Sequence, residues 1–345
     1  MRNCRFRFFA LLITGSIGIL AIAPAEGADI LRVRRGSDDL NAADQQLFID
    51  AMYAMKAAPA RGNGTLANNR YDEYVRLHEI FRNHMNSGFL PWHRKMLWEF
   101  ESEIRQLDPV KFGNFTLPYW NLNFDFFPDY LVGAGGNPIL VDGPFAASHW
   151  TTVNPGEISG LHALERNFFD IGDFPQIGSI ELLTAFVLLQ PDFEMMSMRL
   201  EINWHNYTHN AVGGQFATIA GAVDDPFFWL LHSWVDMVWA LWQARTGSTT
   251  ADDYMPFMDG PGLDELMSGF GDLTNLTDIG FNSTMFNTVR DQLDPRNTTS
   301  LGYNYEFLGQ MVLPPVAVPE PRSLVLAALS IAALAGSARA RRQSR

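Results

Sequence analysis

Apolar residues recur at helical spacing along much of the chain, and this pattern predicts a fold dominated by α-helices. Four stretches carry the pattern: residues 44–58, 71–84, 94–107 and 225–242. Between them, residues 133–155 and 252–277 are rich in Gly, Pro, Asn and Asp, which predicts irregular loops. The expected fold class is therefore mainly α, with long irregular loops.

Six of the eight histidines fall into two groups of three within or beside these helical stretches. The first trio is His78, His84 and His93, and the second trio is His205, His209 and His232. His205 and His209 are four residues apart, so they lie on one face of a helix and can chelate one ion. His232 would bring the third nitrogen from a second helix. His84 follows His78 by six residues, which is off the helical repeat, so it should lie at a frayed helix end or in the next loop.

Two trios of neutral imidazoles favour a pair of copper ions, because no cysteine lies near them and no carboxylate has ligand spacing inside either trio. Di-iron sites in helical bundles rely on glutamates, and catalytic zinc usually takes a single three-ligand site with one water. Iron and zinc therefore fit less well. A single histidine is more often an ordinary core or surface residue than a ligand, so we assign no metal to His149 or His162.

The segments around both trios resemble the two copper motifs of the tyrosinase family of type 3 copper proteins. Residues 89–94 are similar to the family's third ligand segment for the first copper, and residues 117–121 to its Pro-Tyr-Trp segment. Residues 205–214 and 225–232 are similar to its second copper motif. Residues 302–305 resemble the Tyr-x-Tyr segment that ends the family's catalytic domain, so the resemblance covers roughly residues 40 to 310.

The resemblance implies a tyrosinase-like di-copper four-helix bundle, in which two antiparallel helix pairs donate ligands inward. The first copper ion would be bound by His78, His84 and His93, and the second by His205, His209 and His232. It also implies dioxygen as co-substrate and small phenols as substrates, with hydroxylation of monophenols and oxidation of o-diphenols to o-quinones. Paired redox metals held by ligands that survive oxidation suit such chemistry. The expected activity is that of a copper-dependent oxidoreductase.

Glu201 and Asn206 are the candidate catalytic residues. A phenol must lose its proton to coordinate copper, so a carboxylate that orients a water near the second copper would help as general base. Glu201 precedes His205 by one helical turn, and its position is similar to the water-holding glutamate of plant family members. Glu194 is the second candidate, because other bacterial members place this glutamate further upstream. The alternative for either glutamate is a solvated charge on a helix.

Three positions bear on the choice of reaction. Asn206 matches the position where monophenol-hydroxylating members often carry asparagine, which favours a tyrosinase over a catechol oxidase without monophenolase activity. Asn210 departs from the arginine of several bacterial tyrosinases, which affects how a substrate would be oriented. Ile219 falls where the family places a gate above the active site, with ordinary packing as the alternative.

Length, charge and cysteine content limit the number of domains, the class of partner and the covalent links that the protein can have. Residues 29–312 are within the range of one large catalytic domain. The formal net charge of −13 argues against nucleic acid and anionic membrane surfaces as partners. The single cysteine, Cys4, precedes the expected mature chain, which would therefore have neither disulfides nor a thioether linked to a ligand histidine.

Both ends of the chain have the patterns of exported proteins. Residues 1–28 combine arginines, an apolar run and small residues, as in a secretory signal peptide. Residues 313–345 resemble the PEP-CTERM sorting signal of Gram-negative bacteria, which implies transient membrane association and processing by an exosortase-like enzyme. The alternative is a short C-terminal anchor that stays. We expect the protein at the cell surface, in the periplasm or outside a Gram-negative bacterium.

Two other classes of protein remain as alternatives. Haemocyanins share the copper pair and carry oxygen, but they surround the site with further domains for which this chain has no room. A surface-attachment protein with a lapsed copper site is the other alternative, prompted by the sorting signal. The presence of all six candidate ligands speaks against it.

Overall fold

The computed structural model describes residues 32–61, 67–122, 127–132, 143–146, 148–153, 161–167, 183–270 and 285–306. The expected signal peptide at residues 1–28 and the sorting segment at residues 313–345 lie outside the described residues. Among the helices of the described part, none has both the length and the hydropathy needed to cross a membrane.

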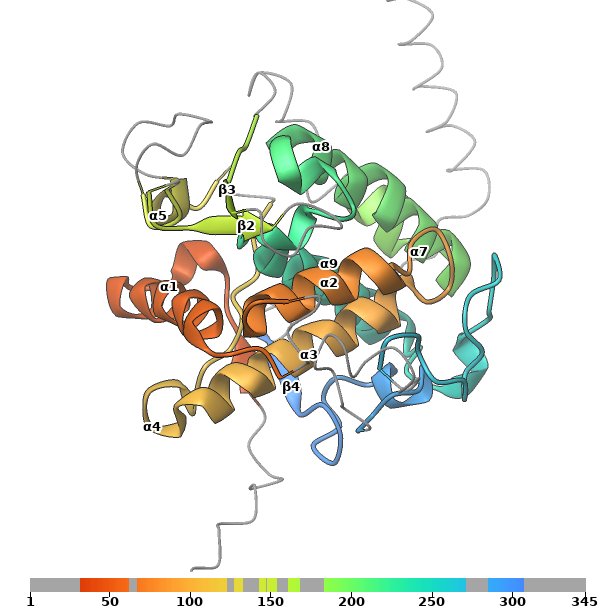
Figure 1. Ribbon diagram of the computed structural model, residues 1–345. Helices are drawn as coiled ribbons and strands as arrows, with labels where there is room; N and C mark the ends of the chain where they lie inside the picture. Colours follow the sequence, from red (N-terminus) through yellow and green to blue (C-terminus); the bar gives the residue numbers. More distant parts are fainter. Residues whose placement is uncertain are drawn as a thin grey trace, which may run out of the picture.

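Four helical segments form the centre of the molecule (Figure 1). They are α2 (Arg70–Phe81), α3 (Phe89–Leu107), the continuous run of α7 (Phe193–Leu200), η4 (Glu201–His205) and α8 (Asn206–Val212), and α9 (Phe227–Thr246). Helix α9 packs against α3. This arrangement confirms the expected mainly α fold with a four-helix core.

Further helices and helical turns surround this core. They are α1 (Ala42–Ala57), α4 (Pro109–Phe112), α5 (Asp129–Val132), the π-helical turn η3 (Thr184–Leu188), and the 3₁₀ turns η1 (Ser37–Asp39), η5 (Gly214–Ala217), η6 (Ala222–Asp224), η7 (Ala251–Asp253) and η8 (Arg290–Gln292). Helix α1 packs against both α2 and α3. It matches the amphipathic helix expected at residues 44–58.

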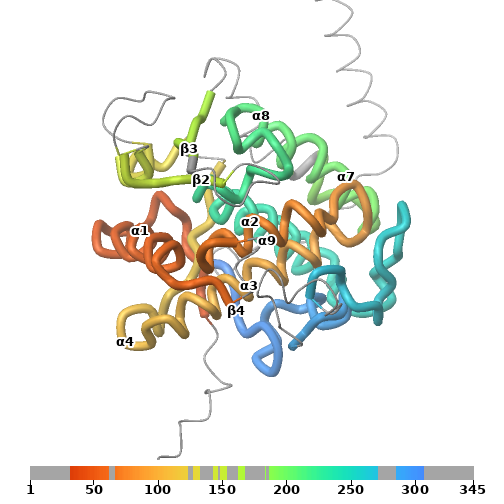
Figure 2. Tube along the Cα trace, in the orientation of Figure 1, coloured from red at the N-terminus to blue at the C-terminus, as the bar shows by residue number. Residues whose placement is uncertain are grey.

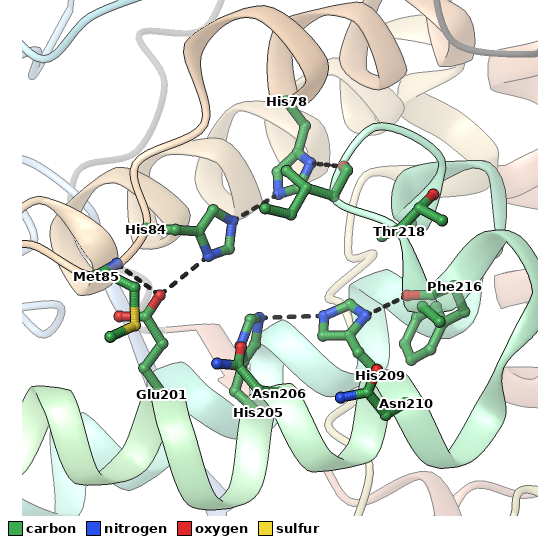
Figure 3. A pocket seen from close by; sticks show the side chains of 13 residues that line it. His78, His84, Met85, Glu201, His205, Asn206, His209, Asn210, Phe216 and Thr218 are labelled. Carbon is green, nitrogen blue, oxygen red and sulfur yellow. Dashed lines mark hydrogen bonds and ion pairs between the residues drawn. The ribbon is translucent and has the colours of Figure 1, made fainter. Parts of the chain in front are cut away.

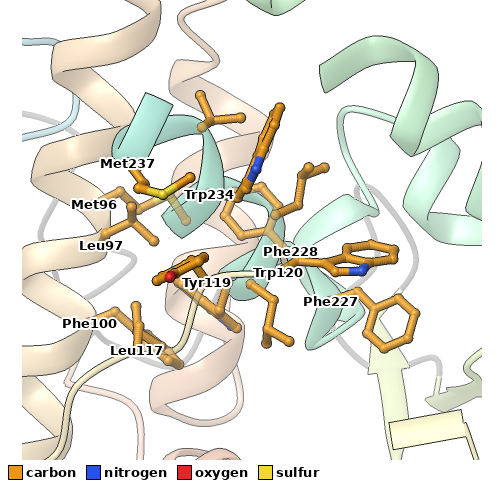
Figure 4. Close-up of a cluster of buried hydrophobic side chains, with 14 of the residues drawn as sticks. Met96, Leu97, Phe100, Leu117, Tyr119, Trp120, Phe227, Phe228, Trp234 and Met237 are labelled. Carbon is orange, nitrogen blue, oxygen red and sulfur yellow. The ribbon is translucent and has the colours of Figure 1, made fainter. Parts of the chain in front are cut away.

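Helix α9 is the most deeply buried element, because its sequence is apolar on every side. Phe100 of α3 and Trp229 of α9 stack with their ring centroids 3.4 Å apart. Figure 4 shows how side chains of α3, of the segment after α4 and of α9 meet in this cluster, with Leu117, Tyr119 and Trp120 between the two helices. This packing of aromatic rings fixes the beginning of α9 against α3.

Side-chain caps explain where several helices begin. The Asn69 side chain accepts a hydrogen bond from the backbone N–H of Asp72 at the start of α2, and Asp192 caps α7 in the same way. Helix α2 ends at Phe81, not at His84 as the apolar pattern predicted. The chain leaves the helical conformation at Arg82 and adopts a left-handed conformation at Met85, with φ of 58°. His84 therefore lies in the loop, as its spacing from His78 indicated.

Two short sheets complete the fold. β1 (Arg32–Arg34) pairs in parallel with β4 (Tyr303–Tyr305), so the beginning and the end of the described chain lie together (Figure 2). β2 (Thr151–Val153) pairs antiparallel with β3 (Leu161–Ala163). The prediction of irregular structure throughout residues 133–155 is therefore wrong at residues 151–153, which form β2. Thr151–Val153 is a β-branched run, and its pairing with β3 overrides the loop-like composition around it.

A buried carboxyl group, that of Asp224, lies in η6, just before α9 begins. The Asp224 side chain is fully buried and accepts one hydrogen bond, from the Val153 backbone N–H at 3.1 Å, and its second oxygen has no partner among the described residues. Burial raises the pKa of Asp224 to about 7. The folded protein thus keeps a proton on Asp224 that the unfolded chain releases above pH about 4.

We expect Asp224→Asn to stabilise the protein increasingly as pH rises from 4 to 7. In this window the folded state of the wild type binds more protons at Asp224 than the unfolded state, so its stability falls as pH rises. The amide does not titrate, and its advantage should grow across the window by up to about 4 kcal/mol and then stay constant. Urea unfolding of both proteins at pH 4, 5.5 and 8 measures the difference. A difference independent of pH would mean that Asp224 ionises normally in the folded protein.

Candidate dinuclear metal centre

The six histidines of the two trios meet inside the four-helix core, and Figure 3 shows how His78, His84, His205 and His209 point toward one another. Within each trio, one ring nitrogen from every histidine lies within 4.8 Å of the other two. The first trio comes from α2 (His78), the following loop (His84) and the first turns of α3 (His93), and the second from η4 (His205), α8 (His209) and α9 (His232). The structure thus brings together every histidine that the sequence grouped. Neither His149 nor His162 belongs to such a group among the described residues, and His149 is exposed on a loop.

Every one of the six rings has its Nδ1 atom beside an oxygen. Four of these oxygens are backbone carbonyls and two belong to side chains. The pairs are His78 with Ile219 O at 2.7 Å, His93 with Phe89 O at 2.8 Å, His209 with Phe216 O at 2.7 Å, His232 with Phe228 O at 2.9 Å, His84 with Glu201 Oε1 at 3.1 Å, and His205 with Asn206 Oδ1 at 2.8 Å. Because a carbonyl or carboxylate oxygen only accepts, each Nδ1 carries the proton. Each neutral ring then presents an unprotonated Nε2 to the centre.

Within each trio the Nε2 atoms lie close to one another. His78 Nε2 lies 3.3 Å from that of His84 and 3.4 Å from that of His93. His205 Nε2 lies 3.1 Å from those of His209 and His232. Two imidazole nitrogens bound tetrahedrally to one ion at about 2.0 Å would be about 3.3 Å apart. The donor set of each trio therefore fits one metal ion, and two all-imidazole trios fit a binuclear type 3 copper site.

Burial keeps five of the six rings neutral and ready to bind metal. Desolvation lowers the pKa of His78, His93, His205 and His232 well below the ordinary value, and neighbouring histidines lower it further. The pKa of His209 falls to about 3, again chiefly through burial. Neutral imidazole is the form that coordinates metals.

The two trios face each other at close range. The rings of His93 and His232 stack with centroids 4.6 Å apart, and those of His84 and His205 lie 5.5 Å apart. Phe228 stacks on His232 at 3.8 Å and thereby restricts its rotation. The described residues include no cysteine that could form a covalent link, and aromatic packing and the Nδ1 hydrogen bonds hold these rings.

Glu201 and Asn206 both line the cavity beside the centre. Glu201 is buried, and one of its oxygens accepts from His84 Nδ1 and, at 2.8 Å, from the Met85 backbone N–H. It lies in the π-helical turn η4, an element that often marks functional sites. Glu194 is exposed on the first turn of α7 and does not line this cavity. Of the two candidate glutamates, Glu201 is therefore the one beside the metal centre.

The cavity above the histidines has a volume of about 260 Å³. Since an apolar cavity of about 150 Å³ accommodates benzene, this space suffices for one substituted aromatic ring. Four of the histidines, His78, His84, His205 and His209, line it together with Glu201 and Asn206. The other lining residues are Met85, Asn210, Phe216, Ala217, Thr218, Ile219 and Ala222. The Ile219 side chain is exposed at the rim of the cavity. Such exposure does not favour the alternative in which Ile219 is an ordinary packing residue.

Sequence reasoning did not identify the carbonyl groups that hold the rings. Phe89 and Phe228 each precede a ligand by four residues on the same helix, and this spacing could have indicated them. Phe216 and Ile219 offered no signal, because every residue has a carbonyl and only the path of the chain selects these two.

Comparison with known proteins agrees with this geometry. The family model described as the common central domain of tyrosinase matches residues 68–245. A tyrosinase from Streptomyces lincolnensis is 30% identical over 278 residues, which cover 70% of this chain and 93% of that protein.

Two solved structures show the same fold. A polyphenol oxidase variant from Thermothelomyces thermophila has a TM-score of 0.58 at 18% identity and covers 80% of this chain and 88% of its own. A functional unit of octopus haemocyanin has a TM-score of 0.57 at 20% identity and covers 80% of this chain and 68% of its own. The matched domain includes all six grouped histidines, and the chain belongs to the tyrosinase family of copper oxidoreductases.

Proposed function

We propose that the protein is a tyrosinase, which uses dioxygen to hydroxylate monophenols and to oxidise o-diphenols to o-quinones. In this proposal His78, His84 and His93 bind one copper ion, and His205, His209 and His232 bind the other. The observation that carries it is the convergence of six unprotonated Nε2 atoms beneath a cavity large enough for one aromatic ring. Bound copper would supply dioxygen binding and the transfer of two electrons.

The proposed role of Glu201 and Asn206 is to assist the removal of the proton from the phenol. Asn206 accepts from His205 through its carbonyl oxygen, which leaves its amide N–H groups to donate to a water in the cavity. The Glu201 carboxylate could accept from the same water through the oxygen that binds neither His84 nor Met85. A water held between a carboxylate and an amide is a suitable relay for the proton of a phenol.

The cavity lining supports small, uncharged phenols as substrates. Glu201 is the one carboxylate among the described lining residues, and none of those residues is a lysine or an arginine. Asn210 stands at the exposed rim with an uncharged amide. A phenol whose substituent carries a carboxylate would therefore meet no cation there.

Oxygen consumption by the copper-loaded protein should rise with both a monophenol and an o-diphenol. We expect Asn206→Asp to lower the monophenol rate by about 100-fold, because aspartate offers no N–H to the water. The diphenol rate should fall less, since its neighbouring hydroxyl donates to the phenolate as it forms. The ratio of the two initial rates, in wild type and variant, is the measurement.

Two outcomes would redirect the proposal. Turnover of the diphenol alone would make the protein a catechol oxidase and remove the role given to Asn206. Two bound copper ions without turnover of either phenol would favour an oxygen-binding protein, the function of the haemocyanin whose fold it shares.

A further inference from the structure

One short loop holds a ligand of each metal site. The segment Gly213–Ile219, which we call the strap, follows α8 and contains η5. Phe216 in the strap accepts from His209 Nδ1, as Figure 3 shows, and three residues later the Ile219 carbonyl accepts from His78 Nδ1. The two rings belong to different trios. The position of the strap therefore sets the orientation of one imidazole at each metal.

The strap lies directly on the backbone that follows β3. Gly213 and Gly214 have φ of 72° and 57°. A Cβ atom on Gly214 would come within 1.8 Å of the Glu165 carbonyl oxygen, and one on Gly213 within 2.3 Å of the Asn167 carbonyl oxygen. Only glycine permits this approach in this backbone conformation. Contact at this distance means that a shift of residues 163–167 would be passed to the strap.

Gln215 fastens the strap to that backbone. Its own backbone N–H donates to Glu165 O at 3.2 Å, and its side-chain oxygen accepts from the Glu165 N–H at 2.7 Å. Its side-chain amide donates to Ala163 O at 2.9 Å and, at 3.5 Å, to Thr152 Oγ1 of β2. One residue thus makes three hydrogen bonds to two residues of the same segment. It does not line the cavity and touches neither metal site.

The segment beneath the strap is itself anchored in the core. Arg166 forms a bidentate ion pair with Asp225, with N–O distances of 2.6 and 2.7 Å, and both side chains are completely buried. Asp225 in turn accepts from the Phe227 backbone N–H at the start of α9, the helix that carries His232. Gln215 therefore links the strap to a segment that the Arg166–Asp225 ion pair joins to α9, the helix of a third ligand.

We propose that Gln215 is a positioning residue for both metal sites, an inference that rests on the proposed ligand assignment. Without its three side-chain hydrogen bonds the strap can move away from residues 163–167, and the Phe216 and Ile219 carbonyls move with it. His209 and His78 then lose the acceptors that keep their Nε2 atoms aimed at the metals. Removing partners that orient metal-bound histidines costs about 10-fold to 100-fold in metal affinity. Here one substitution lowers affinity at both sites together.

The test compares Gln215→Met with the wild type by copper retention. Methionine keeps the length of the side chain and removes all three hydrogen bonds of the amide. Copper-loaded full-length proteins are dialysed against a series of chelator concentrations, and copper per chain is determined by atomic absorption. We expect both ions to be lost at about 10-fold to 100-fold lower chelator concentration. Gln45→Met is the matched control, because Gln45, in α1, makes a single side-chain hydrogen bond among the described residues, to Leu40 O, and is remote from the centre.

A second variant guards against a general loss of folding. Gln215→Glu retains the acceptor for the Glu165 N–H and loses the donor to Ala163 O, so its copper affinity should lie between those of Gln215→Met and the wild type. Wild-type retention by Gln215→Met would overturn the inference and leave the proposed function intact. So would loss of only one ion. A wild-type protein that binds no copper would overturn the ligand assignment and this inference with it.

Discussion

Replacing His209 by alanine is expected to empty the second metal site and abolish turnover. His209 supplies one of three nitrogens, with its Nε2 3.1 Å from that of His205, and its Nδ1 hydrogen bond to Phe216 fixes the direction of the lone pair. Loss of a metal-binding nitrogen should cost more than the roughly 100-fold that loss of an orienting partner costs. Copper per chain should fall from two to one. Oxidation of a diphenol needs both ions, so oxygen consumption should fall to background.

His149→Ala is the control for this experiment. The His149 ring is exposed and its nitrogens lie beside Ser148 Oγ and Gly143 O, outside both trios. Its replacement should leave copper content and turnover unchanged. Loss of copper in this variant would show that the loop histidine contributes to a metal site and that the assignment of the trios is wrong.

Asp236→Asn is expected to cause the largest loss of stability among single substitutions that touch no ligand. The Asp236 carboxylate, in α9, is buried and accepts from two arginines and two tyrosines: Arg34, Arg94, Tyr303 and Tyr305. These four residues come from β1, α3 and β4, so one carboxylate joins both ends of the described chain to the core. Burial raises the pKa of both tyrosines, which keep the protons that they donate.

The amide in Asp236→Asn has nearly the same shape but no charge, and it leaves two buried guanidinium groups without their shared counterion. Breaking a buried ion pair costs about 3 to 5 kcal/mol. In a domain of this size we expect Tm to fall by about 6 to 12 °C. Scanning calorimetry of wild type and variant measures the shift.

Asp264→Asn is the matched control, since Asp264 forms its ion pair with Arg290 on the exposed surface. Solvent screens such a pair, so Tm should not change measurably. Equal Tm shifts in the two variants would mean that the buried cluster contributes no more than a surface pair.

The sequence alone determined the chemistry of the centre. Helical periodicity placed His78 and His93 on separate helices, and the four-residue spacing put His205 and His209 on one face of a third. Six imidazoles without cysteine left few metals to choose from. The off-period position of His84 predicted a frayed helix end or the following loop, and the loop is what the structure shows. These properties are local, because they depend on side-chain type and on spacing within one helix.

Only the tertiary structure decided how the histidines are held. The acceptor for His78 lies 141 residues away at Ile219, and that for His84 lies 117 residues away at Glu201. Of the two carboxylates that pair with Arg34, that of Asp236 is 202 residues distant. Every residue has a backbone carbonyl, so residue type does not indicate which carbonyl will accept a hydrogen bond. The packing of α3 against α9 and the path of the strap select these long-range partners. The residues that bind metal could be read from the pattern, whereas the groups that aim them depend on how distant segments pack.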